Sequence, residues 1–295
     1  MTQIAFIGLG NMGGPMAANL AAAGRKVVGC DLVEELRVAA HKTGIAVTHD
    51  PIEALKGADT VITMLPAGKH VRAVWQGLLP HAAKDTLFID CSTIDIESAR
   101  AVHAMAKEAG MASLDAPVSG GTGGAKAGTL TFMVGGEIEA YARGALILNQ
   151  MGKKIVHCGA AGAGQAAKVC NNMILGISMI GVSEAFALAE KLGLSDQALY
   201  DVASTSSGQC WSLTSYCPVP GPVLASPANN AYKPGFAADL MLKDLKLAQD
   251  AAASTGAAIP MGSHAAQLYA MFAGQGHGGM DFSAIIQMMK GKAAG

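Results

Sequence analysis

The feature that most constrains this chain is its opening, where an apolar run leads directly into Gly-x-Gly-x-x-Gly. The run covers residues 3–7, and the three glycines are Gly8, Gly10 and Gly13. In a strand–turn–helix unit the first glycine permits a tight turn, the second lets the backbone approach a pyrophosphate, and the third lets the helix pack close to the strand. The N–H groups at the helix start then face the phosphates. The opening therefore predicts a dinucleotide site with contacts from Gly8, Leu9, Gly10, Asn11, Met12 and Gly13.

The residues around these glycines support this interpretation. A chain with 37 glycines can have three at this spacing by chance. However, Pro15 falls in the first turn of the expected helix, where its missing N–H costs little. A second apolar run ends at Asp31, about eighteen residues past Gly13, where a carboxylate accepts hydrogen bonds from the adenosine ribose and repels a 2′-phosphate. Asp31 therefore predicts NAD rather than NADP, with a solvated loop aspartate as the alternative.

Composition and charge exclude several classes of protein. The 295 residues are 51% hydrophobic, enough for one large core or two ordinary ones. The net charge of −1 offers no basic field for nucleic acid or an anionic membrane. The most apolar tract, 173–182, is about half as long as a membrane span, so we expect a buried helix there. The six cysteines have no metal-ligand spacing, and no metal site is predicted.

Short apolar runs alternate with helical stretches up to about residue 160, and the alternation then stops. After the opening strand, strands are expected near 27–31, 60–64, 87–90, 113–115, 131–134 and 154–157. Helices are expected at 195–204, 237–254, 261–274 and 282–289. This pattern predicts an α/β fold, a Rossmann-type doubly wound, mostly parallel sheet followed by an all-α domain. The predicted domains are 1–162 and 163–295, joined by a long helix over 165–192.

Residues that directly follow strands are candidates for the ligand site, because ligands of such sheets lie beyond the carboxyl ends of the strands. Leu65 and Pro66 follow one strand and Thr93 follows another. Strand termination and helix capping are the alternatives for these residues. The turn 119–124 contains a serine and several glycines, whose hydroxyl and backbone N–H groups are suited to a carboxylate, unless the turn is only a flexible loop.

Lys168 and Asn172 lie four residues apart on the long predicted helix, so they share one face. Their neighbours are mostly apolar, with no acidic residue nearby. Loss of hydration there would lower the pKa of Lys168 and make it a proton donor or acceptor near neutral pH. The alternatives are a lysine whose amine reaches solvent and a core asparagine that is fully hydrogen-bonded.

Two other positions stay open from the residues alone. Lys243 lies near Asp239 and Asp244, and its spacing from Asp239 is also that of an exposed helical ion pair. Trp211 follows a predicted helix and would either shield a site or simply pack. The N-terminus enters a strand within a few residues, which predicts no export signal and a cytoplasmic protein.

The ordered series of motifs resembles the β-hydroxyacid dehydrogenase family, most closely the members that oxidise 3-hydroxyisobutyrate. The matching segments are 8–13, 63–66, 90–93, 115–121, 162–172, 206–211, 218–221 and 236–244. The 6-phosphogluconate dehydrogenases are longer and carry Lys-x-x-His-Asn at the matching helix. Imine reductases usually lack the lysine that this chain has as Lys168. The resemblance implies a dinucleotide domain, and a helical domain that completes the active site.

The resemblance also implies roles for individual residues. Lys168 is similar to the family's catalytic lysine, which exchanges a proton with the substrate hydroxyl. The implied substrate-binding residues are Ser119, Gly120, Gly121, Asn172, Trp211 and Lys243. The residues implied to join the glycine turn and Asp31 in binding the cofactor are Leu65, Pro66, Thr93, Phe236 and Lys243.

The activity implied by the resemblance is NAD-dependent oxidation of 3-hydroxyisobutyrate to methylmalonate semialdehyde, a step of valine breakdown, by a homodimer or homotetramer. Related reactions on tartronate semialdehyde, glycerate or serine stay open, because one methyl or hydroxyl group in a pocket changes discrimination by only about 1–3 kcal/mol. A catalytically inert protein that senses NAD and binds a protein partner is the non-enzyme alternative. The presence of Lys168 argues against it.

Overall fold

The structure is a computed structural model that describes residues 3–291. The chain divides into two compact units between Lys168 and Val169. This division falls inside helix α8 (Ala163–Lys191), which begins two residues before the predicted helix and ends one residue before it. Each unit is described in its own terms.

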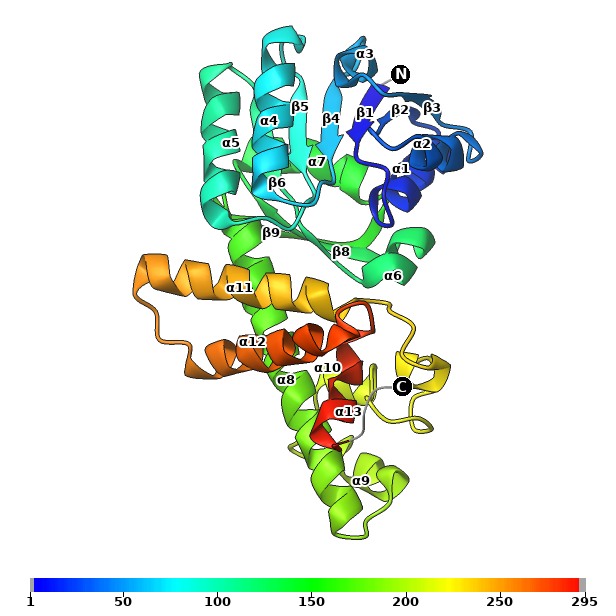
Figure 1. The fold of residues 1–295 in the computed structure, drawn as a ribbon. Coiled ribbons are helices and arrows are strands. Elements are labelled where there is room, and N and C mark those ends of the chain that lie inside the picture. The colour runs from blue at the N-terminus through cyan, green and yellow to red at the C-terminus, as the bar shows by residue number, and fades with distance from the viewer. Residues whose placement is uncertain (1–2, 292–295) are drawn as a thin grey trace. The chain divides into compact units, whose positions relative to one another are not determined.

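The first unit is built on a nine-stranded sheet, as counted over the described residues (Figure 1). The strand order is β3-β2-β1-β4-β5-β6-β8-β7, and β9 pairs with β8. The strands are β1 (Gln3–Ile7), β2 (Lys26–Cys30), β3 (Ala46–Thr48), β4 (Thr60–Thr63), β5 (Leu87–Asp90), β6 (Ala112–Asp115), β7 (Val118–Ser119), β8 (Leu130–Gly135) and β9 (Gly152–Gly159). The pairs from β3 through β6 are parallel, whereas β8 is antiparallel to β6 and β7. The mostly parallel Rossmann-type sheet confirms the predicted fold class.

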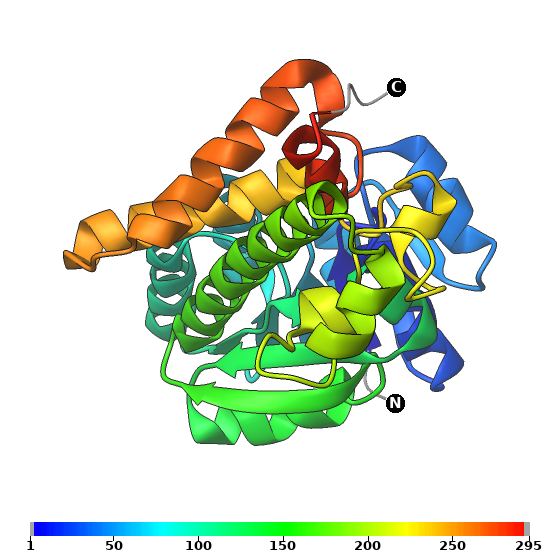
Figure 2. The ribbon, with the colours of Figure 1, turned by 90° about the horizontal axis from the view of Figure 1, so that it is seen from below.

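Helices cover both faces of this sheet (Figures 1 and 2). They are α1 (Gly13–Ala22), α2 (Glu34–His41), α3 (Pro51–Leu55), α4 (Gly68–Leu78), α5 (Ile96–Glu108), α6 (Gly121–Ala127) and α7 (Ile138–Leu148). Successive side chains of a strand point to opposite faces. Ile4 and Phe6 of β1 therefore join one core with α1 and α7, and Ala5 joins the other with α3, α4 and α5.

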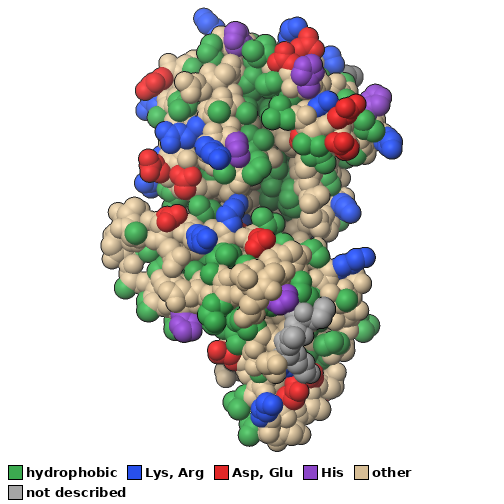
Figure 3. Space-filling view, in the orientation of Figure 1, with side chains coloured by type: hydrophobic (Ala, Val, Ile, Leu, Met, Phe, Trp, Pro, Cys, Tyr) green, Lys and Arg blue, Asp and Glu red, His purple; other side chains and the backbone are tan. Residues whose placement is uncertain are grey.

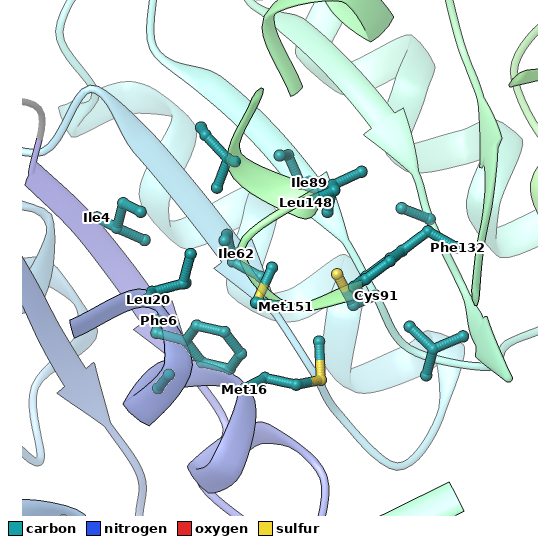
Figure 4. Close-up of a cluster of buried hydrophobic side chains, with 14 of the residues drawn as sticks. Ile4, Phe6, Met16, Leu20, Ile62, Ile89, Cys91, Phe132, Leu148 and Met151 are labelled. Carbon is teal, nitrogen blue, oxygen red and sulfur yellow. The ribbon is translucent and has the colours of Figure 1, made fainter. Parts of the chain in front are cut away.

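Both faces of the central strands are buried, so these strands are continuous apolar runs rather than alternating ones. Figure 4 shows part of the first core, with Phe6 next to Leu20 and Met16 of α1. Complete burial of a side chain such as Phe6 contributes about 1.5–3 kcal/mol to folding. The apolar opening of the chain is therefore the centre of the unit, with the glycine turn at its carboxyl end.

The second unit is helical. It contains most of α8, followed by α9 (Asp196–Ala203), α10 (Trp211–Thr214), α11 (Ala238–Thr255), α12 (Pro260–Phe272) and α13 (Ile285–Met289). Helices α11 and α12 run side by side in opposite directions (Figures 1 and 2). Met241 and Leu245 of α11 share a core with Tyr269 of α12 and Met179 of α8. The helical unit confirms the second part of the fold prediction.

The structure also corrects several predicted elements. Strands β3 and β7 were not predicted, because they have only three and two residues. The helix predicted over 282–289 is a 3₁₀ turn (Phe282–Ala284) followed by α13. Ser195 accepts the N–H of Ala198 as the N-cap of α9, so α9 starts one residue later than predicted.

Helix α8 is longer than the apolar tract 173–182 that it contains. By length and composition alone it could cross a membrane, with a mean hydropathy of 1.5 over its most apolar stretch. The core helix of a globular protein meets the same criteria, and Met179, Ile180 and Phe186 of α8 pack into the cores of the second unit. On the face of the first unit shown in Figure 3, acidic and basic side chains are interspersed. That face has no field of a single sign for a polyanion.

Candidate active site

The turn between β1 and α1 has no room for a side chain at two of its glycines. A Cβ on Gly8 would meet the carbonyl oxygen of Met64, and one on Gly13 would meet the carbonyl oxygen of Gly8. Gly8 also has a φ of 99°, which favours glycine. By contrast, nothing lies within 4 Å of the position of a Cβ on Gly10. The backbone at Gly10 is therefore open to a ligand, and the turn fits a dinucleotide pyrophosphate at the start of α1.

Asp31 follows β2 and holds the glycine turn. One carboxylate oxygen accepts the backbone N–H of Leu9 at 2.7 Å, and the other accepts the N–H of Val33 at 2.9 Å. One oxygen therefore bonds to the glycine turn and the other to the loop that follows β2, so Asp31 has a structural role in the turn and is not only a solvated loop residue. The carboxylate lies where an adenosine ribose binds in such folds.

A basic residue next to Asp31 was missed in the sequence. The guanidinium of Arg37 donates to the carbonyl oxygens of Asp31 at 2.8 Å and Leu32 at 2.9 Å. Leu32 and Val33, which follow Asp31 directly, are not basic, whereas Arg37 lies on α2 and its side chain returns to this position. An arginine here is the group that accommodates a 2′-phosphate in NADP-binding folds.

The loops after β4 and β5 are tied together beside the glycine turn. The backbone N–H of Leu65 donates to the hydroxyl of Ser92 at 2.8 Å. A Cβ on Gly8 would lie 3.1 Å from a methyl carbon of Leu65, so Leu65 borders the turn, while Pro66 is exposed. Thr93 does not cap α5, because Asp95 accepts the N–H of Ser98 at 2.6 Å in that role. The capping alternative for Thr93 is therefore wrong.

A buried carboxyl group lies under these loops. One oxygen of Asp90 accepts the hydroxyls of Thr63 at 2.7 Å and Ser92 at 2.6 Å. Its other oxygen has no hydrogen-bond partner among the described residues. Burial raises the pKa of Asp90 to about 6, against the lowering effect of these hydrogen bonds, and the nearby charge of Asp115 adds to the rise.

The turn from Ser119 to Gly121 joins β7 to α6. Ser119 ends the strand, and Gly120 and Gly121 have φ angles of 131° and 60°, which favour glycine. The turn is therefore defined by a strand and a helix rather than being a flexible loop. The first N–H groups of a helix have no acceptor within the helix. Those at the start of α6 are suited to a small carboxylate.

Lys168 and Asn172 lie one turn apart on α8, on either side of the division between the units. Lys168 is 7% exposed. In the second unit the amide of Asn172 donates to the carboxylate of Asp244 at 2.5 Å and accepts from Asn171 at 3.0 Å. The ammonium of Lys243 lies 3.7 Å from the other oxygen of Asp244. Asn172, Lys243 and Asp244 therefore form one polar cluster.

Aromatic rings form a stack in the second unit. Trp211 is 52% exposed and stacks on Tyr216 with 4.9 Å between ring centroids. Tyr216 stacks in turn on Phe282 at 5.3 Å, and Phe236 meets Phe282 edge-on at 5.7 Å. Trp211 thus packs through its contact with Tyr216 and keeps about half of its surface available to a ligand.

The sheet order with the glycine turn at its switch point, and a carboxylate at the end of β2, define the class of dinucleotide-binding oxidoreductase folds. No group of three or more His, Cys, Asp or Glu side chains able to hold a metal occurs within residues 3–291. Two sequence families match the chain. Residues 3–159 match the NAD binding domain of 6-phosphogluconate dehydrogenase, and residues 162–289 match a domain described as NAD-binding of NADP-dependent 3-hydroxyisobutyrate dehydrogenase.

The chain belongs to the β-hydroxyacid dehydrogenase family, as its motifs predicted, and is an NAD-dependent oxidoreductase. A probable 3-hydroxyisobutyrate dehydrogenase of Mycobacterium tuberculosis is 55% identical over 99% of both chains. An NAD-dependent L-serine dehydrogenase of Pseudomonas aeruginosa is 49% identical over 98% of both. A solved structure of M. tuberculosis 3-hydroxyisobutyrate dehydrogenase with L-serine has a TM-score of 0.95 at 56% identity, and covers 98% of this chain and 99% of its own. These relatives argue against an inert NAD sensor.

Proposed function

We propose that this chain oxidises 3-hydroxyisobutyrate to methylmalonate semialdehyde with NAD, as a step of valine breakdown. The observation that carries the proposal is the 55% identity, over 99% of both chains, to a probable 3-hydroxyisobutyrate dehydrogenase. The open backbone at Gly10 and the carboxylate of Asp31 support NAD as the coenzyme. We further propose that NAD is preferred to NADP, because Asp31 would repel a 2′-phosphate.

Lys168 is the residue that we assign as general base. Oxidation of a hydroxymethyl group removes a proton from the oxygen and a hydride from the carbon. The amine of Lys168 takes the proton as the C=O bond forms, and returns it in the reverse reaction. Bound NAD supplies the hydride acceptor. The burial of Lys168 supports this role, because a base shielded from bulk water exchanges its proton with the substrate.

The remaining site residues are assigned by the chemistry that each group offers. The N–H groups of Gly120 and Gly121 and the hydroxyl of Ser119 bind the substrate carboxylate. Asn172, Trp211 and Lys243 complete the substrate site. Leu65, Pro66, Thr93, Phe236 and Lys243 contact the coenzyme. The proposed domains are an NAD-binding domain over 1–162 and a substrate and oligomerisation domain over 163–295.

L-serine is the second candidate substrate. A relative of similar identity is an NAD-dependent L-serine dehydrogenase, and a closely similar solved structure contains L-serine. Serine and 3-hydroxyisobutyrate share a hydroxymethyl group and a carboxylate, and differ in an amino group against a methyl group. A pocket separates two such compounds strongly only where it can pair the amino group.

The test is kcat/KM with NAD for 3-hydroxyisobutyrate, L-serine and glycerate in parallel. The proposal predicts the highest value for 3-hydroxyisobutyrate. A higher value for L-serine would identify the chain as a serine dehydrogenase, and a higher value for glycerate would contradict both.

We also propose that the enzyme is a cytoplasmic homodimer or homotetramer. Large apolar side chains on α8 and directly after it support the assembly, since Ile174 and Leu188 of α8 are 65% and 60% exposed and Leu192, which follows the helix, is 75% exposed. The bacterial relatives support the location. Light scattering that gives the mass of a single chain, 29.9 kDa, would contradict the assembly.

A further inference from the structure

The start of α8 is held by a carboxylate that the proposed mechanism does not use. Asp115 ends β6 and is 1% exposed. One of its oxygens accepts the N–H of Gly162 at 2.8 Å, and the other accepts the N–H of Gln165 at 2.9 Å. A negative charge bonded to the first N–H groups of a helix stabilises that end. Asp115 therefore fixes the first turn of α8 to the sheet.

Asp115 is itself held in one orientation. Nε2 of His103 lies 2.9 Å from the oxygen that Gly162 also contacts. The other ring nitrogen of His103 lies 2.7 Å from the hydroxyl of Ser113. The imidazole and the serine therefore restrict rotation of the carboxylate, so that both of its oxygens stay on the helix.

Two glycines bring the helix and the sheet unusually close. A Cβ on Gly164 would lie 2.7 Å from the carbonyl oxygen of Asp115 and 2.8 Å from its carboxylate. A Cβ on Gly135 of β8 would lie 2.8 Å from the backbone nitrogens of Ala163 and Gly164. The first turn of α8 thus lies directly on the backbone of β6 and β8. There is little freedom for it to rotate or slide.

The side chain of Gln165 connects the same turn to the loop after β5. Its amide donates to the carbonyl oxygen of Ser92 at 2.7 Å and accepts the N–H of Ile94 at 3.2 Å. Gln165 is fully buried. The carbonyl of Ser92 and the N–H of Ile94 lie on either side of Thr93. The amide of Gln165 therefore bridges the residue that we assign as a coenzyme contact.

We propose that Asp115 and Gln165 are positioning residues for the reaction. Asp115 fixes the first turn of α8 to the sheet. Gln165, three residues before Lys168, fixes the same turn to the loop that carries Thr93. This inference rests on the proposed function, because it takes Lys168 as the general base and Thr93 as a coenzyme contact. Neither residue has to touch the substrate to affect the rate, because a displacement of about 1 Å in a reacting group can cost about 10²-fold.

The first test is Gln165→Ala, with Gln3→Ala as its matched control. Gln3 is also a buried glutamine of the first unit whose amide donates to a backbone carbonyl, that of Lys56 at 2.6 Å. Both variants should lower the melting temperature. Only Gln165→Ala should lower kcat for 3-hydroxyisobutyrate, by about 10- to 100-fold. It should also raise the dissociation constant of NAD, measured by calorimetry, by about threefold or more.

The second test is the pH profile of Gln165→Glu. At low pH the new carboxyl group is protonated and can donate to the carbonyl of Ser92 as the amide does, whereas its ionised form cannot. Its kcat relative to wild type should therefore rise at least fivefold between pH 8 and pH 5.5. Asp115→Asn, which puts an N–H group against the helix N–H groups, should lower kcat at all pH values.

The outcomes separate this inference from the proposed function. If Lys168→Ala is inactive but Gln165→Ala matches Gln3→Ala in kcat and NAD affinity, the positioning role is overturned and the base assignment stands. If Lys168→Ala stays active, the base assignment fails and the positioning inference fails with it, whereas the proposed function itself fails only if wild type does not oxidise 3-hydroxyisobutyrate with NAD. A flat relative pH profile for Gln165→Glu would likewise overturn the role of its amide.

Discussion

At the scale of single residues, we propose that coenzyme choice depends on two opposite charges at the end of β2. Asp31 bonds to the backbone of the glycine turn, and Arg37 bonds to the carbonyl of Asp31. A carboxylate favours the two free hydroxyls of NAD, whereas a guanidinium favours the 2′-phosphate of NADP. The carboxylate was predicted from its distance along the chain. The contact of Arg37 was not predicted, because Arg37 lies six residues after Asp31 and reaches it only through the fold of α2.

Asp31→Asn tests this pair, because it removes the charge while it keeps a side-chain oxygen for the N–H of Leu9. We expect the ratio of kcat/KM for NAD to that for NADP to fall by about tenfold or more, which corresponds to about 1.4 kcal/mol. Adding Arg37→Gln should remove most of the gained NADP activity. An unchanged ratio in Asp31→Asn would contradict the role of the carboxylate.

At the scale of helices and strands, the sequence predicts what depends on local periodicity. The apolar runs of β1, β4 and β5 are long enough to identify from the residues alone, whereas β3 and β7 are too short. Contacts between strand ends could not be predicted. Asp115 reaches Gly162 across 47 positions, and Asn172 reaches Asp244 across 72. Such pairs are set by the order of strands and by helix packing, which one sequence does not reveal.

The buried carboxyl group at the end of β5 gives the folded protein a pH-dependent stability. The pKa of Asp90 is about 6 in the folded protein, against 3.8 as the ordinary value. Between these values the folded protein keeps a proton that the unfolded chain releases, so stability falls as the pH rises from about 4 to about 6. A difference of about two pKa units corresponds to about 3 kcal/mol.

Asp90→Asn should remove this dependence, because an amide does not ionise. Urea unfolding from pH 4 to pH 7 should show wild type losing about 2 kcal/mol of unfolding free energy relative to the variant, because the unfolded carboxyl group is already partly ionised at pH 4. Parallel curves for the two proteins would mean that Asp90 ionises normally in the folded state.

At the scale of the whole molecule, one helix belongs to both units. Contacts of Asp115 and Gln165 fix its first turn within the first unit, and Asp244 bonds to Asn172 within the second. Lys168 is the last residue of the first unit. The motifs predict Lys168 and Asn172 as the site residues of α8, and that stays a prediction. The groups that hold α8 in place became visible only in three dimensions.

The central claim is that the amine of Lys168 takes the proton from the substrate hydroxyl. The most direct measurement is kcat for 3-hydroxyisobutyrate oxidation by Lys168→Ala, with NAD affinity measured by calorimetry on the same preparation. We expect kcat to fall by about 10²- to 10⁴-fold, the usual contribution of a general base, with NAD affinity within about twofold of wild type. Added methylamine should restore part of the rate. A kcat within about threefold of wild type would contradict the claim.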